Sequence, residues 1–379
     1  MKLLPLLAGN AIAMMVCTLL LWLFGEVPAA LAAHLTLALG IMPLILAAMA
    51  YFVPVLTRSD GAPPAIESMA VLAWLGGAAM VASLLGGVAR NPVAGIALTI
   101  VGALLAAKAA ATVLVWTLLR ARRSLGAAHP GLAWYVAALG FLLLALACVP
   151  LLLLWPERFG ALRLVHLHAN LAGFVGLAAI GTLQVLLPTA AGRWDKQAAS
   201  RLAQDLKFAL AGAALLALGA GFSGFLAAAG AALFCVPLAR MGRVWLFDYA
   251  DQIGRPHGAS AALGAACVGL IGLLIAGVAH GLAHLGAHGA IAGFVLAFLV
   301  PLVSGAAMQL LPVWLRPGRQ DAWHERLRAA LGRYSGVHAS LLVAGGLIVA
   351  CGYDQGLWLA AAGLALLLAV AARALLGAR

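Results

Sequence analysis

Twelve long apolar runs constrain this chain more than any other feature of its sequence. Most of them approach or exceed the roughly 20 residues that a helix needs to cross a bilayer. Because lipid satisfies no backbone groups, only helices and closed barrels span it, and each run is predicted to be a helix. The sequence therefore predicts an all-α, polytopic transmembrane helix bundle of about 12 helices. Their expected limits are residues 5–25, 29–55, 67–89, 92–119, 131–154, 161–188, 206–220, 222–240, 258–280, 284–312, 333–352 and 355–375.

Composition excludes the soluble classes of protein. Only 9% of the residues are charged and 65% are hydrophobic, and the mean hydropathy is +1.09. A soluble chain carries about 25% charged residues, so a soluble enzyme, a secreted disulfide scaffold and a disordered chain are excluded. A net charge of +12 would suggest nucleic acid as the partner of a soluble protein. Here the charge lies in short loops, so we expect the lipid bilayer as partner and no nucleic acid.

The positions of Lys and Arg predict the orientation. All 23 of them lie near the termini or in alternate loops, except Arg90, Lys108, Arg158 and Arg163. Since cytoplasmic loops are enriched in basic residues, both termini are expected in the cytoplasm, with the chain in a bacterial inner membrane. Residues 5–25 also look like a signal peptide. Removal of this segment would leave eleven spans, and an odd number of spans would place the two termini on opposite sides of the membrane.

The second, sixth and tenth predicted helices resemble one another. In the second and sixth, a proline follows a histidine by twenty positions: His34 precedes Pro54, and His168 precedes Pro188. The tenth ends at Pro312, with its histidine about one turn further out. Each helix is second in a group of four. The chain is therefore predicted to be a single integral membrane domain, residues 1–379, of three quasi-equivalent four-helix units near 1–120, 131–240 and 258–375.

Six histidines are expected in the outer leaflet, near the outer ends of their helices: His34, His166, His168, His280, His284 and His288. Polar residues at membrane depth are candidates for a functional site, and imidazole suits copper, iron and zinc. Since His166 and His168 are two residues apart, a helix directs them about 200° apart, toward two separate sites. His280, His284 and His288 are spaced four apart, so we expect one stripe. All six could instead bind water or lipid headgroups.

Other residues support this prediction less directly. Arg163 could pair with a haem propionate or anchor its helix at the interface. Cys17, Cys148 and Cys267 precede outer histidines by seventeen or eighteen residues and could share ligation, although buried cysteine is usually a small hydrophobe. Of the remaining histidines, three are expected in solvated loops, and one is expected in the core with its hydrogen bonds satisfied. The three expected in loops are His129, His257 and His324, and the one expected in the core is His338.

The bundle of three units with outer histidines resembles the catalytic subunit of the haem–copper oxidases. The segment from His166 to Phe174, His-Leu-His-Ala-Asn-Leu-Ala-Gly-Phe, followed by Pro188, is closer still to the NnrS family of haem- and copper-containing membrane proteins. That resemblance implies a b-type haem and/or copper as cofactor, nitric oxide or oxygen as a gas ligand, and a redox partner. The residues implied to bind the cofactor are His34, His166, His168, His284, His288 and Arg163.

The chain also departs from the oxidases. The seventh and eighth predicted helices hold no histidine and the sixth holds no tyrosine, so an oxygen-reducing binuclear centre is not expected. All eleven acidic residues are expected in loops or at helix ends, which argues against proton pumping. Three functions stay open: a haem- and/or copper-binding protein in nitric oxide or oxygen response or electron transfer, a copper-handling transport or assembly factor, and a transporter or scaffold without a prosthetic group.

Overall fold

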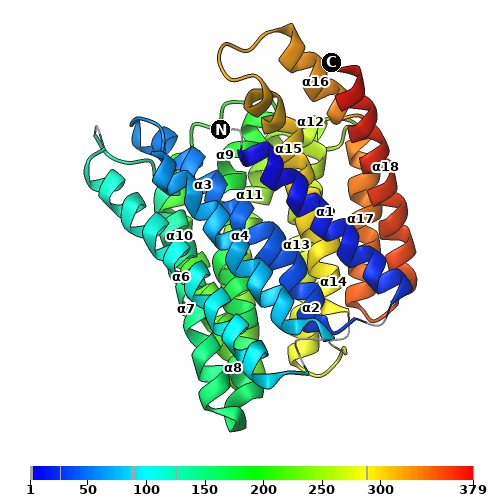
Figure 1. Cartoon of the computed structure of the whole chain (residues 1–379). Helices are drawn as coiled ribbons and strands as arrows, with labels where there is room; N and C mark the ends of the chain where they lie inside the picture. The colour runs from blue at the N-terminus through cyan, green and yellow to red at the C-terminus, as the bar shows by residue number, and fades with distance from the viewer. Residues whose placement is uncertain (1–2, 26, 87–89, 125, 287–288, 379) are drawn as a thin grey trace.

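The protein is a bundle of helices (Figure 1). The computed structural model describes residues 3–25, 27–86, 90–124, 126–286 and 289–378. These residues form no strand, and twelve of their helices are long and apolar enough to cross a membrane. The predicted all-α polytopic bundle is therefore confirmed.

The twelve candidate spans follow the predicted order. They are α1 (Leu3–Phe24), α2–η1–α3 (Ala29–Thr57), α4 (Pro64–Leu84), α6 (Pro92–Arg122), α7 (Gly131–Leu154), η2–α8–η3–α9 (Pro156–Ala190), α10 (Ala198–Phe222), α11 (Gly224–Asp248), α13 (Ala259–Gly281), α14–η4–α15 (Ala290–Leu315), α16–α17 (Ala322–Ala350) and α18 (Gln355–Gly377). A short helix, α12 (Ala250–Ile253), joins α11 to α13.

The seventh and eighth spans are longer than predicted. Both α10 and α11 have 25 residues, and they meet at Ser223, whose hydroxyl accepts a hydrogen bond from the backbone N–H of Leu226. The predicted limits, 206–220 and 222–240, were too short because charged residues occupy the outlying turns. Arg201 and Asp205 lie inside α10 and are buried, so charge marked the end of the apolar run but not the end of the helix.

The three repeat helices share a feature that sequence alone does not show. Each contains a π-helical segment: η1 (Leu35–Ile41), η3 (Ala169–Gly176) and η4 (Phe294–Leu299). Each segment ends twelve or thirteen residues before the proline near the end of its helix. The second, sixth and tenth spans therefore share an irregularity at nearly the same distance from their prolines. π-Helical turns occur frequently at functional sites.

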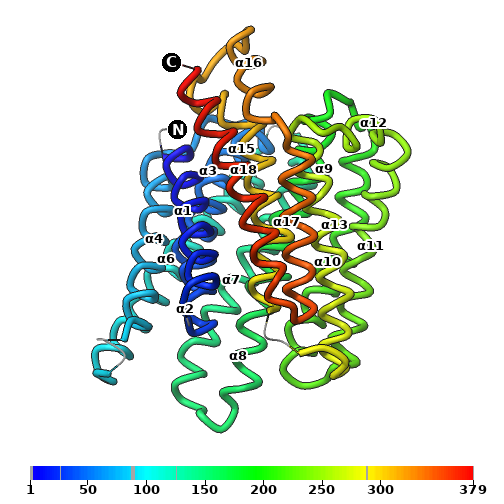
Figure 2. The backbone as a smooth tube through the Cα atoms, turned by 90° about the vertical axis from the view of Figure 1, so that its right-hand side faces the viewer, coloured from blue at the N-terminus to red at the C-terminus, as the bar shows by residue number. Residues whose placement is uncertain are grey.

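These three helices also form the centre of the bundle. Between 56% and 83% of the residues in their most apolar windows are buried, against at most 50% in any other span. Both ends of the chain lie at one end of the molecule, which we call the basic end because the loops that follow α3, α6, α9 and α15 carry its arginines (Figures 1 and 2). Helices α2, α8 and α14 lie toward the opposite end, which we call the histidine end.

Candidate metal centre

Two of the predicted ligands meet between the second and sixth spans. His34 is the last residue of α2 (Ala29–His34), and His166 lies on α8 (Phe159–His168). Their imidazole centroids are 6.3 Å apart, and the ring planes are within 22° of parallel. A metal–nitrogen bond is about 2.0–2.1 Å long, so two imidazoles on opposite sides of one ion have centroids about 6 Å apart. The centroid distance matches that spacing, and the two rings are stacked, so a metal held by both would also require each ring to turn its Nε2 toward the ion.

Backbone carbonyls fix the orientation of both rings. The Nδ1 atoms of His34 and His166 lie 2.7 Å from the carbonyl oxygen of Ala30 and 2.8 Å from that of Ala145, respectively. A carbonyl can only accept, so Nδ1 carries the proton and the lone pair is left on Nε2. Metal-binding histidines are held in the same way, with the second ring nitrogen donating to a carbonyl or carboxylate.

Asn170 lies one helical turn beyond His166 and belongs to the same site. Its amide nitrogen donates to the carbonyl oxygen of His166 at 2.9 Å and lies 3.4 Å from Nε2 of that ring. Because Nδ1 of His166 carries the proton, Asn170 donates this second, longer hydrogen bond to the Nε2 lone pair, and a metal at Nε2 would displace it.

The two rings open into a pocket between the second, third, fourth, fifth and sixth spans. The space between its walls amounts to about 760 Å³, including an open mouth. Apart from His34, His166 and Asn170, the lining is apolar or glycine, and it includes the thioethers of Met42 and Met80. A pocket with a few polar groups converging in an apolar wall is typical of cofactor sites.

Close helix packing forms the wall of this pocket. A Cβ atom on Gly77 of α4 would lie 2.3 Å from the carbonyl oxygen of Ala38 in η1. Only glycine allows the two backbones this contact, and small residues serve the same purpose at helix interfaces in membranes. Gly77 therefore sets the position of α4 against the helix that carries His34.

His168 points to a different neighbour, as the spacing of two residues predicts. Its Nδ1 lies 2.9 Å from the carbonyl oxygen of Leu164, and its ring is within electrostatic range of His280. His280 is exposed near the end of α13, and its Nδ1 lies 2.9 Å from the carbonyl oxygen of Leu285. On the sixth span, His166 thus stacks on His34 of the second span, and His168 does not line their pocket.

The expected stripe of His280, His284 and His288 is wrong. Helix α13 ends at Gly281 and the next begins at Ala290, so His280 and His284 do not share a helix. His284 is exposed in the connecting loop, where Ala283 has a positive φ of 61°. His288 lies outside the described residues. The loop forms because Gly281 and Gly286 punctuate a segment that hydrophobicity alone had extended into the helix.

Arg163 and the cysteines are not part of the pocket. Arg163 is exposed on α8 and does not line it. Cys148 and Cys267 are buried, and Cys17 is exposed. Within the described part of the chain, no group of three or more His, Cys, Asp or Glu side chains could hold a metal ion. The pair of His34 and His166 is therefore the ligand set on which a metal centre would rest.

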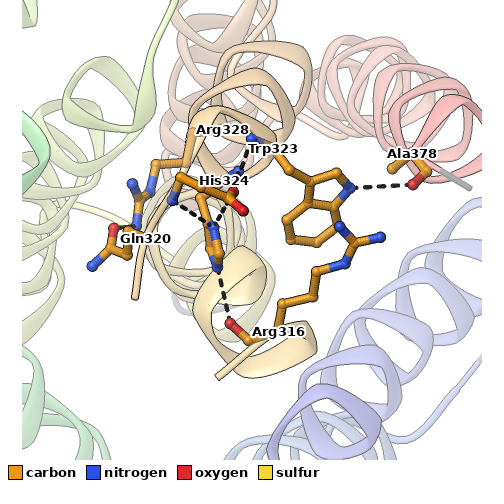
Figure 3. A network of polar contacts seen from close by, with 7 residues as sticks. Arg316, Gln320, Trp323, His324, Arg328 and Ala378 are labelled. Carbon is orange, nitrogen blue, oxygen red and sulfur yellow. Dashed lines mark hydrogen bonds and ion pairs between the residues drawn. The ribbon is translucent and has the colours of Figure 1, made fainter. Parts of the chain in front are cut away.

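The four histidines outside the predicted site differ from expectation in two cases. His324 is 2% exposed rather than solvated, since its Nε2 donates to the Arg316 carbonyl at 2.9 Å and its Nδ1 lies 2.8 Å from the Asp321 carboxylate (Figure 3). His338 is fully buried as predicted, but neither ring nitrogen has a hydrogen-bond partner among the described residues. His257 is exposed and His129 is half-buried.

Sequence reasoning missed a buried polar cluster at the basic end. Arg201 donates from Nε to the amide oxygen of Gln184 at 3.0 Å and forms an ion pair with Asp195. Asp205 is fully buried and forms an ion pair with Arg240 of α11, with 2.6 Å between Oδ1 and Nη1. The expectation that all acids lie in loops or at helix ends is thus wrong for Asp205. The signal was the four-residue spacing of Arg201 and Asp205, which places both on one face of a helix.

Comparison of the sequence with protein-family models finds no match. A search of curated proteins finds no match either.

Proposed function

We propose that this protein is a haem-binding integral membrane protein in which His34 and His166 would hold the haem iron. The observation that carries the proposal is the pair of imidazoles, 6.3 Å apart, each oriented by a backbone carbonyl. The resemblance to the NnrS family agrees with it.

The number of protein ligands favours haem over a simple metal site. A structural zinc site needs four protein ligands and a catalytic one needs three. Two histidines complete the coordination of an iron that already has four porphyrin nitrogens. The interior of the pocket has about 100 Å³ of free space, less than a porphyrin fills, so binding would require the flexible side chains of Met42 and Met80 and the surrounding helices to move apart. The donor set and the apolar lining thus fit a b-type haem.

The residues of the pocket would tune the group that they hold. A bound haem supplies one-electron chemistry and, at an open axial position, affinity for nitric oxide or oxygen. His34 and His166 would hold the iron through two imidazoles, and a haem held in that way would supply electron transfer with a redox partner. Asn170, whose amide nitrogen lies 3.4 Å from Nε2 of His166, would be a hydrogen-bond donor beside the bound group. The apolar wall lowers the local dielectric and excludes water.

The test is an optical spectrum of the detergent-purified protein, oxidised and dithionite-reduced, with iron and copper measured on the same sample. We expect a Soret band, sharp bands after reduction, and about one iron per chain. A variant of the pair, His166→Ala, should lose the Soret band. His280→Ala is its matched control, because His280 is an exposed histidine at the same end of the molecule. Protein that is expressed with adequate haem and copper and carries neither metal would overturn the proposal.

A copper-handling function is the second candidate, because the thioethers of Met42 and Met80 line the same pocket as the two histidines. Imidazole and thioether are ligands that suit copper. Met80→Leu separates the candidates: it keeps the apolar volume, so it should lower copper binding and leave the haem content unchanged. Copper without a Soret band in the wild type would favour this second function.

The proposal includes an orientation. The basic end, which holds both termini, would face the cytoplasm, and the histidine pair would lie in the outer half of a bacterial inner membrane. Reporter fusions at the C-terminus test this: an enzyme active only in the cytoplasm should be active there, and activity of a periplasmic reporter would contradict it.

A further inference from the structure

A wide polar groove lies at the basic end, between the first turns of α10 and the last turns of α11. Its space amounts to about 1130 Å³, open to the surroundings. Three arginines line it, together with polar side chains and the apolar Val244 and Phe247. The arginines are Arg201, Arg240 and Arg243, and the other polar residues are Gln197, Ser200, Gln204 and Asp248.

Two of the arginines are held in place by buried acceptors. Arg201 is 5% exposed and is fixed by Gln184 and Asp195. Arg240 is fixed by the fully buried carboxylate of Asp205, and its Nη2 donates to the Gln204 amide oxygen at 2.9 Å. A guanidinium has five N–H donors, so both retain donors for a ligand. Burying a carboxylate is costly in free energy, and the ion pair with Arg240 offsets part of that cost. The same ion pair holds Arg240 at the groove.

The third arginine has no such partner. Arg243 is exposed, lies three residues after Arg240 on the same face of α11, and makes no ion pair or hydrogen bond with the described residues. Asp248 is the one unpaired acid of the lining and lies two turns further along α11 than Arg240. The cationic part of the groove is therefore the stretch from Arg240 to Arg243.

The first turn of α10 faces this cationic stretch. Gln197 is its N-cap residue and makes no side-chain cap hydrogen bond. Asp195 accepts from the backbone N–H groups of Gln197 and Ala198, so the N–H groups of the next two residues of the first turn are left for a ligand. Helix N-termini favour anions because of these groups and of the helix dipole. Gln197 and Ser200, which line the groove, add side-chain donors. The groove thus presents donors from two helices and one unpaired cation, Arg243, with the unpaired carboxylate of Asp248 further along α11.

From these features we propose that the groove binds a phosphate group, and that this phosphate belongs to the headgroup of an anionic phospholipid. The groove lies at the ends of two candidate spans. Phe247 lines it and is 81% exposed, and the adjacent Leu246 is 67% exposed. Such side chains at the end of a span suit contact with acyl chains. Basic pockets between transmembrane helices bind anionic headgroups in this way. The site does not depend on the histidine pair.

The test uses the full-length protein in detergent, titrated with phosphatidylglycerol, cardiolipin, phosphatidylcholine or inorganic phosphate, with lipid binding measured by native mass spectrometry. We expect anionic lipid to bind more tightly than phosphatidylcholine, and Arg243→Gln to weaken it about 5-fold, the effect of one basic residue near an anionic surface. Arg122→Gln is the matched control, because Arg122 is an exposed arginine at the same end and lies outside the groove.

Each outcome decides the proposal. Equal affinity of the wild type and Arg243→Gln, or an equal loss in Arg122→Gln, would reject the groove as the site. Binding of inorganic phosphate that needs Arg243, without preference for anionic lipid, would keep the phosphate site and reject the lipid as its source. Since Arg243 makes no contact that supports the fold, loss of folding does not obscure the result.

Discussion

The histidine end contains two histidine regions, and only one is organised as a ligand pair. His34 and His166 project from facing helices, and each has its Nδ1 on a backbone carbonyl. In the other region, His280 is exposed at the end of its helix and His284 is exposed in a loop. The two regions have the same residue type at similar depth. The comparison shows that the number of histidines does not define a candidate site. What distinguishes the pair is that backbone carbonyls on packed helices fix the orientation of both rings.

The largest effect is expected from His166→Ala, which breaks the organised pair. The variant should lose bound metal by more than the roughly 10–100-fold that removal of an outer-shell partner alone costs. Iron and copper analysis of the purified variant checks this. Full metal content in a folded His166→Ala protein would show that the pair is structural.

A smaller effect is expected from Gly77→Ala, which disturbs the backbone behind the pair. The added Cβ would lie 2.3 Å from the Ala38 carbonyl oxygen, and such overpacking costs about 1–3 kcal/mol. We expect a lower melting temperature and a lower metal content. Gly140→Ala on α7 is the control, since no atom lies within 4 Å of a Cβ there; equal behaviour of the two variants would refute the packing argument.

The double variant His280→Ala, His284→Ala should have nearly the same metal content and optical spectrum as the wild type. It tests the exposed histidine region, as His166→Ala tests the organised pair. Both side chains are exposed, so metal content and optical spectrum should stay within about 10% of the wild type if the spectrum comes from the organised pair alone. A loss comparable to that of His166→Ala would show that the exposed region supplies a ligand.

The smallest effect concerns His324 at the basic end. Hydrogen bonds hold both of its ring nitrogens, so its ring is fixed as the rings of the organised pair are, but it does not line their pocket. Asp321 caps α16, and the hydrogen bond from His324 holds the pKa of Asp321 below its ordinary value. A carboxyl whose pKa is lowered by folding contributes to the free energy of unfolding at pH values above its unfolded-state pKa, which is about 4. This contribution is lost as the pH falls through the folded-state pKa. Asp321→Asn should lower the melting temperature slightly at pH 7, and this difference should shrink as the pH falls below about 4. A constant difference across that pH range would contradict this.

The sequence predicted more of the fold than of the site. Continuous apolar runs report membrane helices directly, because lipid contact requires apolar side chains all round. The same signal failed where charge is buried in pairs, as for Asp205, and where a loop is apolar, as between Gly281 and Ala290. Charge pairing and loop formation depend on contacts between helices, which hydropathy does not report.

For the site, histidine spacing predicted that His166 and His168 diverge but not which partners they meet. The pairing of His34 with His166 depends on the packing of the second and sixth spans, and the support from Ala145 comes from a backbone carbonyl that any residue would offer. The π-helical segments beside His34 and His168 likewise leave no pattern in the amino-acid types.

The most direct measurement of the central claim is the optical spectrum of His34→Ala beside that of the wild type. If His34 and His166 bind one haem from opposite sides, the wild type is low-spin and six-coordinate. The variant should retain haem through His166, become high-spin, and gain a position that binds carbon monoxide or nitric oxide. An unchanged low-spin spectrum in His34→Ala would contradict the account.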